Sequence, residues 1–300
     1  MWFLLPLIFL FFTPLPAFAQ SPSPNTLSVS PSYLKIDLQQ DEPKASLTYT
    51  NNSANTIELN FSASDFTDLE DGYKLAFLEP KNVNNYQYRL SSWIDFDQKN
   101  LVLSPKSTGT VTVFINKDKL TPGGHYTAIL AHLTSHNNPD TIGIQGVLSS
   151  LIFVRTATGK EIEESKIEKF EALRDLMDFP EAFLMRFHNT GSTDLTPYGL
   201  ITITDSFGRT VAKGILNEDS LVSLPESIRR FDIPVKPQTK LLLPGMYTAK
   251  FDCHFGKTNH QMHTSLQFFS QGNLPIIPLS ACLIVIISII IWRTKNRPKQ

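Results

Sequence analysis

The stretch LTPGGHYTAILAHL, Leu120 to Leu133, decides the fold class, because LLPGMYTAKFDCHF, Leu242 to Phe255, repeats its pattern about 120 residues later. In both stretches a Pro-Gly pair precedes Tyr-Thr-Ala, which begins an alternating run. Proline cannot donate to a sheet ladder and glycine permits the turn, so each stretch predicts a turn followed by a strand. In the first strand Tyr126, Ala128 and Leu130 would share one face. The repeat predicts a duplicated all-β domain.

Short strands with period-two alternation recur along the chain between these stretches. The run Ile57–Phe61 alternates apolar and polar side chains, Pro31 interrupts the first strand, and Asp71-Gly72 marks a tight hairpin with a solvated tip. Turn residues separate strands roughly every 8 to 12 residues, which is typical of immunoglobulin-like sandwiches. The sequence therefore predicts two tandem immunoglobulin-like β-sandwich domains, residues 27–158 and 160–271.

The second domain ends in a predicted hairpin and begins with a segment of ambiguous pattern. If a four-residue loop joins the last two strands, Cys253 lies opposite Met262 and both face the core. Residues 160–178 have two interpretations. Their apolar side chains fit an amphipathic helix, but an opening strand fits as well, and the pattern alone leaves both open.

Both ends of the chain carry apolar segments. Residues 1–19 end in Ala17-Phe18-Ala19, the small-x-small form of a cleavage site, and predict a signal peptide followed by a spacer, residues 20–26. Their lack of basic residues leaves an N-terminal membrane anchor as the alternative. Residues 274–292 carry no charge and would rise about 28 Å as a helix, close to the hydrocarbon thickness of a bilayer. With the basic tail 293–300 behind them, they predict one transmembrane helix and a cytoplasmic tail.

The composition excludes several classes of protein. With 41% hydrophobic and 18% charged residues the chain is globular rather than disordered. The net charge is −1 and four cations lie in the last eight residues, so the rest of the chain is mildly acidic and unsuited to nucleic acid. The two cysteines, Cys253 and Cys282, cannot form a bridge within one domain. Stability must come from core burial.

The candidate metal ligands lie in the final hairpin. Under the register above, Asp252, His254 and His263 share the outward face, and three such ligands could hold zinc in a hydrolase. A solvated polar face explains the same residues. No nucleophile elbow and no phosphate-binding loop is present in the sequence, so we expect no cofactor and no enzyme.

Trp93 is the candidate ligand-contact residue. In SSWIDF it shares a face with Ser91 and Asp95, opposite Ile94 and Phe96. An outward tryptophan could form a platform for a sugar or a protein. A tryptophan that caps a sandwich edge is the alternative.

Several motifs also carry a family resemblance. LTPGGHYTAIL, HNTGSTDLTPYGLITITDSFGR and LPESIRRF, followed by an apolar segment and a basic tail, resemble the WxL-interacting surface proteins of bacteria and their relatives in small-genome bacteria. The likeness covers nearly the whole chain in architecture, but these are turn and strand motifs, which specify fold better than ligand. The resemblance implies a peptidoglycan-binding sandwich followed by a partner- or host-binding one. It also implies a strand within residues 160–178.

The sequence favours a non-catalytic surface protein for adhesion or envelope scaffolding. Its location would be the plasma membrane, single-pass, with the N-terminal ectodomain outside. Its partners would be cell-wall glycan or another surface protein, and the lipid bilayer through residues 274–292. The alternative is a membrane-tethered assembly chaperone that pairs a sandwich edge with a client strand. Against this alternative, pilus-type chaperones are generally soluble and use a basic pair between their domains, for which the sequence offers only Arg155 or Arg174 without a pattern that selects either.

Overall fold

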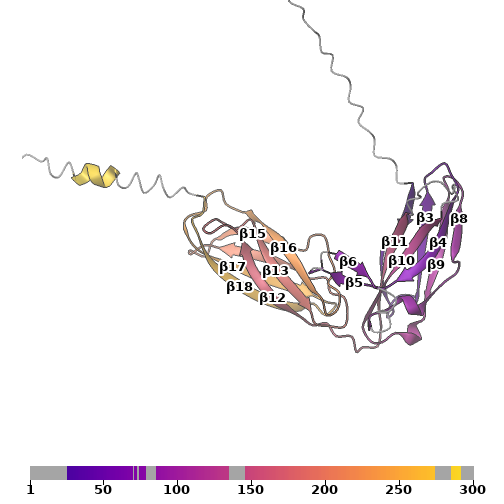
Figure 1. Ribbon diagram of the computed structural model, residues 1–300. Coiled ribbons are helices and arrows are strands. Elements are labelled where there is room, and N and C mark those ends of the chain that lie inside the picture. Colours follow the sequence, from indigo (N-terminus) through magenta and orange to yellow (C-terminus); the bar gives the residue numbers. More distant parts are fainter. Residues whose placement is uncertain are drawn as a thin grey trace, which may run out of the picture.

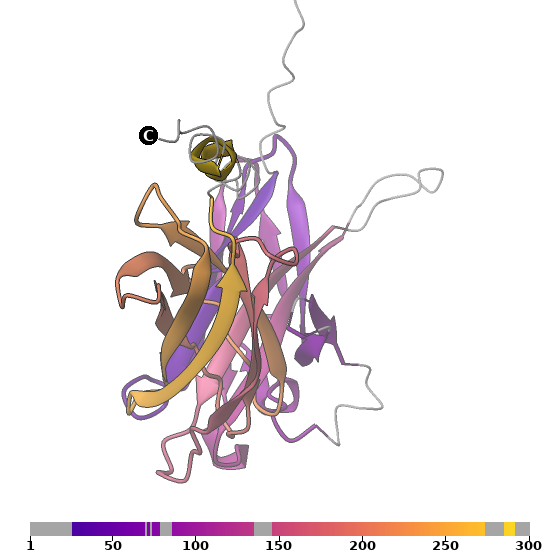
Figure 2. The ribbon, with the colours of Figure 1, turned by 90° about the vertical axis from the view of Figure 1, so that its left-hand side faces the viewer.

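The chain is all-β and folds as two immunoglobulin-like domains in tandem, as the computed structural model shows (Figure 1). The structure describes residues 26–69, 71–72, 74–78, 86–134, 146–273 and 285–291. The two domains lie next to each other in Figure 1, and after a turn of 90° the second lies in front of the first (Figure 2). The molecule is therefore elongated. The all-β part of the prediction is confirmed.

The first domain consists of two facing sheets and a separate hairpin. The four-stranded sheet has the order β1-β3-β9-β7, with β1 (Leu27–Ser30), β3 (Lys44–Asn51), β9 (Thr108–Ile115) and β7 (Ile94–Phe96). The five-stranded sheet has the order β2-β11-β10-β4-β8, with β2 (Tyr33–Asp37), β11 (Val147–Arg155), β10 (Gly124–Thr134), β4 (Ile57–Ser64) and β8 (Asn100–Leu103). The hairpin contains β5 (Phe66–Leu69) and β6 (Lys74–Phe77), and two short 3-10 turns are η1 (Ser91–Trp93) and η2 (Lys117–Lys119).

The N-terminal segment of this domain divides between the two sheets at Pro31, where the sequence predicts a break. Before it β1 pairs with β3, and after it β2 runs parallel to β11. Alternating side chains of both sheets, among them Leu47, Leu59 and Val111, fill the core between them. This N-terminal crossing determines how much of β11 is covered.

Strand β10 is buried on both faces. Ile129 and Ala131 point into the core of the first domain, while Tyr126 and Ala128 belong to a second apolar cluster that includes Leu224 of the second domain. The strand is apolar on both sides because one face meets its own domain and the other meets the neighbouring domain.

The second domain is built from seven strands in the order β12-β13-β16-β15-β14-β17-β18. Their bounds are β12 (Ser165–Leu173), β13 (Ala182–Asn189), β14 (Tyr198–Thr204), β15 (Thr210–Leu216), β16 (Ile228–Pro237), β17 (Gly245–Phe255) and β18 (His260–Ser270). Strand β16 connects the two layers, since Ile228–Pro234 pairs with β13 and Val235–Pro237 pairs with β15. Residues 160–178 therefore supply the strand β12, and the helix interpretation is wrong.

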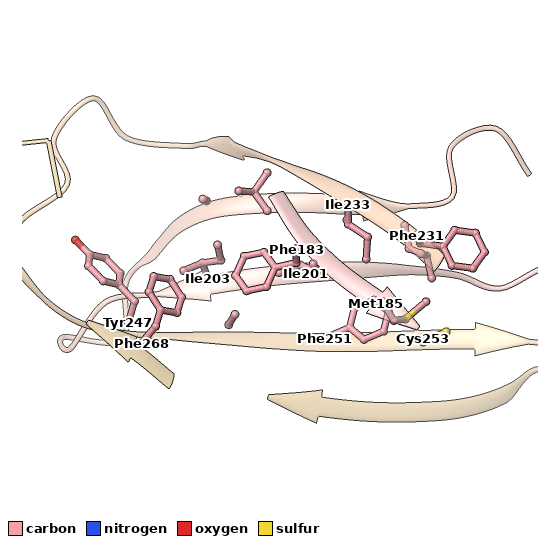
Figure 3. Close-up of a cluster of buried hydrophobic side chains, with 14 of the residues drawn as sticks. Phe183, Met185, Ile201, Ile203, Phe231, Ile233, Tyr247, Phe251, Cys253 and Phe268 are labelled. Atoms are coloured by element: carbon pink, nitrogen blue, oxygen red, sulfur yellow. The ribbon is translucent and has the colours of Figure 1, made fainter. Parts of the chain in front are cut away.

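The core of the second domain confirms the predicted hairpin register. Cys253 lies opposite Met262 in the β17–β18 ladder. Cys253 and Phe251 point into a cluster with Phe183 and Phe268 (Figure 3). Period-two alternation and a four-residue turn are enough to fix this register.

The same asparagine turn closes one end of each domain. Asn51 and Asn189 are fully buried, and each side-chain amide donates to the carbonyl four residues later and to a carbonyl of a distant loop. Each side-chain oxygen accepts an N–H two residues later, from Ser53 and Gly191. These bonds satisfy buried carbonyls that have no place in a sheet ladder.

The predicted terminal segments fall largely outside the described part of the chain. Residues 1–19 and 293–300 are not described, and of the predicted span 274–292 only residues 285–291 are, as a short helix. Among the described residues, no helix combines the length and the apolar character needed to cross a bilayer.

Candidate functional site

Strand β11 is paired on one side along its whole length and on the other along only half of it. β10 pairs with Val147–Arg155, but β2 pairs only with Leu151–Arg155. Within the described residues no strand covers Val147–Ser150 on the side away from β10. We call Val147–Ser150 the free edge.

The main-chain groups of the free edge can be assigned a direction. The N–H of Leu151 donates to the carbonyl of Ser32, which leads into β2, at 2.9 Å. Because successive residues of a strand direct their main-chain groups to opposite sides, Val147 and Ser149 also direct theirs away from β10. Two N–H groups and two C=O groups are therefore available to another strand.

The side chains of the free edge alternate between the core and solvent. Ser150 is fully buried and its hydroxyl donates to the carbonyl of Pro31 at 2.7 Å. Leu148 packs against the core of the first domain. Val147 is 47% exposed and Ser149 is exposed. Its inward side chains thus fix the free edge to the core, and its outward side chains are uncharged. An uncharged strand edge without a partner strand can pair with another chain.

An apolar cluster joins the two domains beside this edge. Its fully or nearly fully buried members are Phe66, Tyr88, Tyr126, Ala128 and Phe153 of the first domain and Leu224 of the second. The Tyr126 and Phe153 rings pack with centroids 5.2 Å apart, and Phe66 packs against Phe153 at 5.7 Å. The second domain thus contacts an aromatic surface of the first domain through Leu224.

The hairpin β5–β6 lies between the domains (Figure 1). Its turn residue Asp71 contacts the second domain twice: its carbonyl accepts the N–H of Arg230 at 2.8 Å, and its carboxylate pairs with Arg186 at 2.9 Å. Asp68 of the same hairpin accepts the hydroxyl of Ser227 at 2.9 Å. The prediction of a solvated hairpin tip is wrong, because the tip contacts β13 and β16. The local pattern could not show this, since both strands are distant in sequence.

A cleft of about 310 Å³ lies between residues of the two domains and contains ion pairs between them. Each pair joins a cation and a carboxylate from different sides of the boundary. The pairs are Lys35 with Asp194 at 2.7 Å, Arg155 with Glu163 at 2.5 Å, and Lys257 with Asp37. The cations of the cleft are therefore neutralised within the molecule.

These pairs decide between the two arginines considered from the sequence. Arg155 lies in the cleft at the end of β11. Arg174 does not line the cleft, since its guanidinium packs over the ring of Phe268 and donates to the carbonyl of Phe269. The second cation beside Arg155 is Lys35, which the sequence analysis missed. In the sequence, the only indication of Lys35 was the alternation of polar and apolar side chains along β2.

The structure brings together two of the three candidate metal ligands. Asp252 and His263 are opposite in the β17–β18 ladder, with Oδ1 and Nδ1 2.6 Å apart. His254 instead stacks on Tyr198, with ring centroids 5.5 Å apart. Nowhere in the described residues do three His, Cys, Asp or Glu side chains gather as a metal site would require. The hydrolase hypothesis gains no support from this geometry.

Trp93 ends the 3-10 turn η1 rather than lying within a strand. The guanidinium of Arg89 lies over its ring, 5.4 Å from the centroid. Its carbonyl accepts the N–H of Asn116 at 2.8 Å, next to the start of β7. This environment fits the edge-capping alternative, and a ligand contact at Trp93 stays a prediction.

This chain resembles known proteins in its fold and not in its sequence. No protein-family model and no curated protein matches the sequence. Solved structures do match. The YadV chaperone is 8% identical with a TM-score of 0.42, covering 81% of this chain and 100% of that one. The SafB chaperone in complex with the Salmonella enterica SafA pilin is 9% identical with a TM-score of 0.40, covering 82% and 99%. The periplasmic chaperone SfaE is 10% identical with a TM-score of 0.35, covering 81% and 98%.

These matches correct the sequence-based recognition and function. The similar structures are two-domain chaperones, so the resemblance to WxL-interacting surface proteins is wrong, and with it the function in adhesion or envelope scaffolding. The physical reason is that the motifs behind it are turn and strand motifs, which many sandwiches share. The structures that the fold resembles are described as chaperones and not as enzymes, which agrees with the prediction of a non-catalytic protein.

The predicted partners and location are corrected as well. SafB was solved with a pilin, in contrast to the expected cell-wall glycan, surface protein and lipid bilayer. SfaE is described as a periplasmic chaperone, which is the finding against the predicted single-pass plasma-membrane location. The likeness to these structures is one of fold.

Proposed function

We propose that the protein is an assembly chaperone that holds a partner polypeptide by adding one strand of it to β11. The observation that carries the proposal is the free edge Val147–Ser150, which β2 leaves uncovered. An extended segment placed there would continue the line of β2 and form up to four main-chain hydrogen bonds, accepting two from N–H groups and donating two to C=O groups of the free edge. Each contributes about 0.5 to 1.5 kcal/mol net, so affinity would come from several bonds together with side-chain burial.

The domain boundary supports this function by holding the site still. The end of β11 is fixed by the ion pair of Arg155 with Glu163, and its outer face is covered at Phe153 by the cluster between the domains. A rigid template binds an extended segment with a smaller ordering cost than a mobile one. The pairing would also cover a strand edge of the partner that would otherwise aggregate.

The proposed partner is a β-rich subunit of a surface assembly, and the SafB chaperone, which is similar in fold, was solved in complex with a pilin. We further propose that residues 1–19 act as a signal peptide, as their sequence predicts, so that the chaperone meets its partner after export. The alternative function drawn from the sequence, strand binding at a sandwich edge, is thereby retained without its membrane tether.

The test places a photo-crosslinking amino acid at Val147 or Ser149 in cells that make the protein. A matched control places it at Val102, which is 63% exposed on β8 at the opposite edge of the same sheet. We expect one partner to be captured from both free-edge positions and not from Val102. Capture at all three positions, or at none, would contradict the proposal.

A proline variant tests the main-chain part of the proposal. Ser149→Pro removes an N–H that points away from β10, and proline is tolerated where a strand edge faces solvent. We expect the adduct from Val147 to fall about fivefold or more in this variant. Val102→Pro, which removes an N–H at the opposite edge, should leave the adduct unchanged.

A further inference from the structure

A second cavity between the domains, of about 460 Å³, begins where the free edge ends. Most of its wall is apolar and comes from both domains. These wall residues include Tyr33, Leu75, Leu151, Phe153, Leu221 and Leu224. Its volume lies in the range of sites that bind small ligands or single large side chains, and a boundary between domains is a common place for such sites.

The cavity is aligned with the free edge. Tyr33 is the first residue of β2 to pair with β11, opposite Leu151. Val147, Ser149, Leu151 and Phe153 share the outer face of the strand, because side chains alternate with period two. A partner residue opposite Ser149 would therefore lie about 7 Å from Tyr33 along the strand direction. A long side chain at that position would extend towards Tyr33 at the wall of the cavity.

Three of the exposed wall residues are large and apolar, and they lie beside the exposed polar residues Lys74, Asp219 and Ser220. Tyr33, Leu75 and Leu221 are 40%, 44% and 41% exposed, although they lie close to a well-packed cluster. They come from β2, from β6 and from the loop between β15 and β16. Their exposure leaves apolar surface that a partner could cover.

One polar group in the wall lacks a donor. Asp68 lines the cavity, and its Oδ2 accepts the hydroxyl of Ser227 at 2.9 Å and the N–H of Leu224 at 3.3 Å. Its Oδ1 is buried and has no hydrogen-bond partner among the described residues. Burial raises the pKa of the Asp68 carboxyl. A buried carboxylate oxygen without a donor is unfavourable, so an occupant is favoured that can donate a hydrogen bond to Oδ1 when the carboxylate turns towards the cavity.

We propose that this cavity binds one tryptophan or tyrosine side chain of the segment that adds to β11. The inference rests on the proposed function and extends it to the side chain recognised. An aromatic ring matches the apolar wall, and the indole N–H or phenol O–H supplies the donor that Oδ1 of Asp68 lacks. Phenylalanine would fill the same space but leave that oxygen unpaired.

The first test uses 3-methylindole, the side chain of tryptophan, and toluene, that of phenylalanine. Each is titrated into the full chain with methyl-labelled leucine, and shifts are followed at Leu75, Leu151 and Leu221. We expect saturable shifts with 3-methylindole and binding of toluene that is roughly fivefold weaker. Leu221→Asp should weaken both, whereas Val102→Asp, on the opposite sheet edge, should change neither. An absence of saturable shifts would overturn the proposal.

The hydrogen bond is tested by Asp68→Asn. Ser227 and Leu224 both donate to Oδ2, so the amide oxygen takes that place and the NH₂ group replaces Oδ1. An acceptor in the cavity thus becomes a donor, and the preference for 3-methylindole over toluene should disappear. Asp95→Asn, at an exposed aspartate of the four-stranded sheet, should retain it. An unchanged preference in Asp68→Asn would overturn the donor requirement.

The last step links the cavity to the partner. With the crosslinker at Val147, Leu221→Asp should lower the adduct about fivefold. If 3-methylindole binds but Leu221→Asp leaves the adduct unchanged, the cavity does not serve the partner and the proposed function still stands. If the unmodified protein gives no adduct at Val147, the proposed function fails, and the assignment of the cavity to the partner fails with it.

Discussion

Lys35 and Asp194 form an ion pair across the domain boundary, with Nζ 2.7 Å from Oδ2. The other carboxylate oxygen of Asp194 accepts the hydroxyl of the fully buried Tyr126 at 3.4 Å. Burial alone would lower the pKa of Lys35, but the charge and hydrogen bond of Asp194, with a smaller effect of Tyr33, raise it. One carboxylate of the second domain therefore holds β2 and β10, the strands on either side of β11.

Replacing this carboxylate should loosen the domain boundary. In Asp194→Ala the hydroxyl of Tyr126 loses its acceptor and Lys35 loses its counterion, so we expect the free energy of unfolding to fall by about 1 to 3 kcal/mol. Denaturant unfolding followed by tryptophan fluorescence measures it. Asp118→Ala, at an exposed residue of η2, should stay within about 0.5 kcal/mol of the unmodified protein. Equal effects of both changes would show that Asp194 contributes nothing to the boundary.

Acid should weaken the connection between the domains. Burial alone would raise the pKa of Glu161, but hydrogen bonds from Thr156 and Thr158 lower it to about 2 from an ordinary value of 4.5. Because the folded pKa lies below the unfolded one, this stabilisation is present above about pH 4.5 and is lost as the pH falls towards 2. In Glu161→Gln, the free energy of unfolding, measured at several pH values, should therefore change less between pH 4.5 and 2 than in the unmodified protein.

The neighbouring Glu163 contributes in the same direction. Burial alone would raise its pKa, but N–H donors of Lys257 and Thr258 and the guanidinium of Arg155 lower it. Glu163→Gln should therefore also flatten the acid side of the stability profile. Glu218→Gln, at an exposed loop residue, serves as the control and should keep the profile of the unmodified protein. If stability fell equally steeply with acid in Glu161→Gln, Glu163→Gln and Glu218→Gln, neither Glu161 nor Glu163 would be the source of the acid dependence.

The thiol of Cys253 should be inert in the folded protein. Its side chain points from β17 into the core of the second domain and is fully buried, and burial raises its pKa to about 12. Only the thiolate reacts with iodoacetamide, so at pH 8 we expect no labelling of Cys253 until denaturant opens the second domain. Peptide mass spectrometry distinguishes it from Cys282. Labelling of Cys253 at the rate seen in denaturant would contradict the register with Met262.

The asparagine turns should contribute equally to the two domains. Asn51→Ala and Asn189→Ala each leave buried carbonyls without donors, and we expect each to lower the free energy of unfolding by about 1 to 3 kcal/mol. Asn116→Ala is the matched control, because Asn116 makes no side-chain capping bond at η2. If either turn variant resembled this control, the turn would not be a shared stabilising feature.

The sequence could predict those parts of the fold that depend on local periodicity. The β17–β18 hairpin has one apolar and one polar face, so alternation alone places Cys253 opposite Met262.

The repeated Tyr-Thr-Ala stretches resemble each other in sequence but differ in the direction of their tyrosine side chains. Tyr247 points into the core of its domain, whereas Tyr126 points out of its own domain towards Leu224. The first stretch has one more residue between Pro-Gly and Tyr, and β10 is apolar on both faces, so its pattern could not reveal the difference.

The site depended on contacts between distant residues and was largely out of reach. Which part of β11 is covered depends on where β2 begins to pair, at Tyr33, and Pro31 gave only a hint of that position. The partner of Lys35 is 159 residues away, and that of Asp68 is equally far, at Ser227. No periodicity within β2 or β5 encodes such distances.

The hairpin β5–β6 also has a consequence for the order of events during synthesis. Asp71 is made 115 residues before Arg186, one of the two arginines that it contacts. Until Leu224 and the strands β13 and β16 emerge from the ribosome, the aromatic outer face of β10 and β11 lacks the part of its cover that the second domain supplies. We therefore expect the newborn first domain to be prone to aggregation, and closure of the boundary to be the last event in maturation.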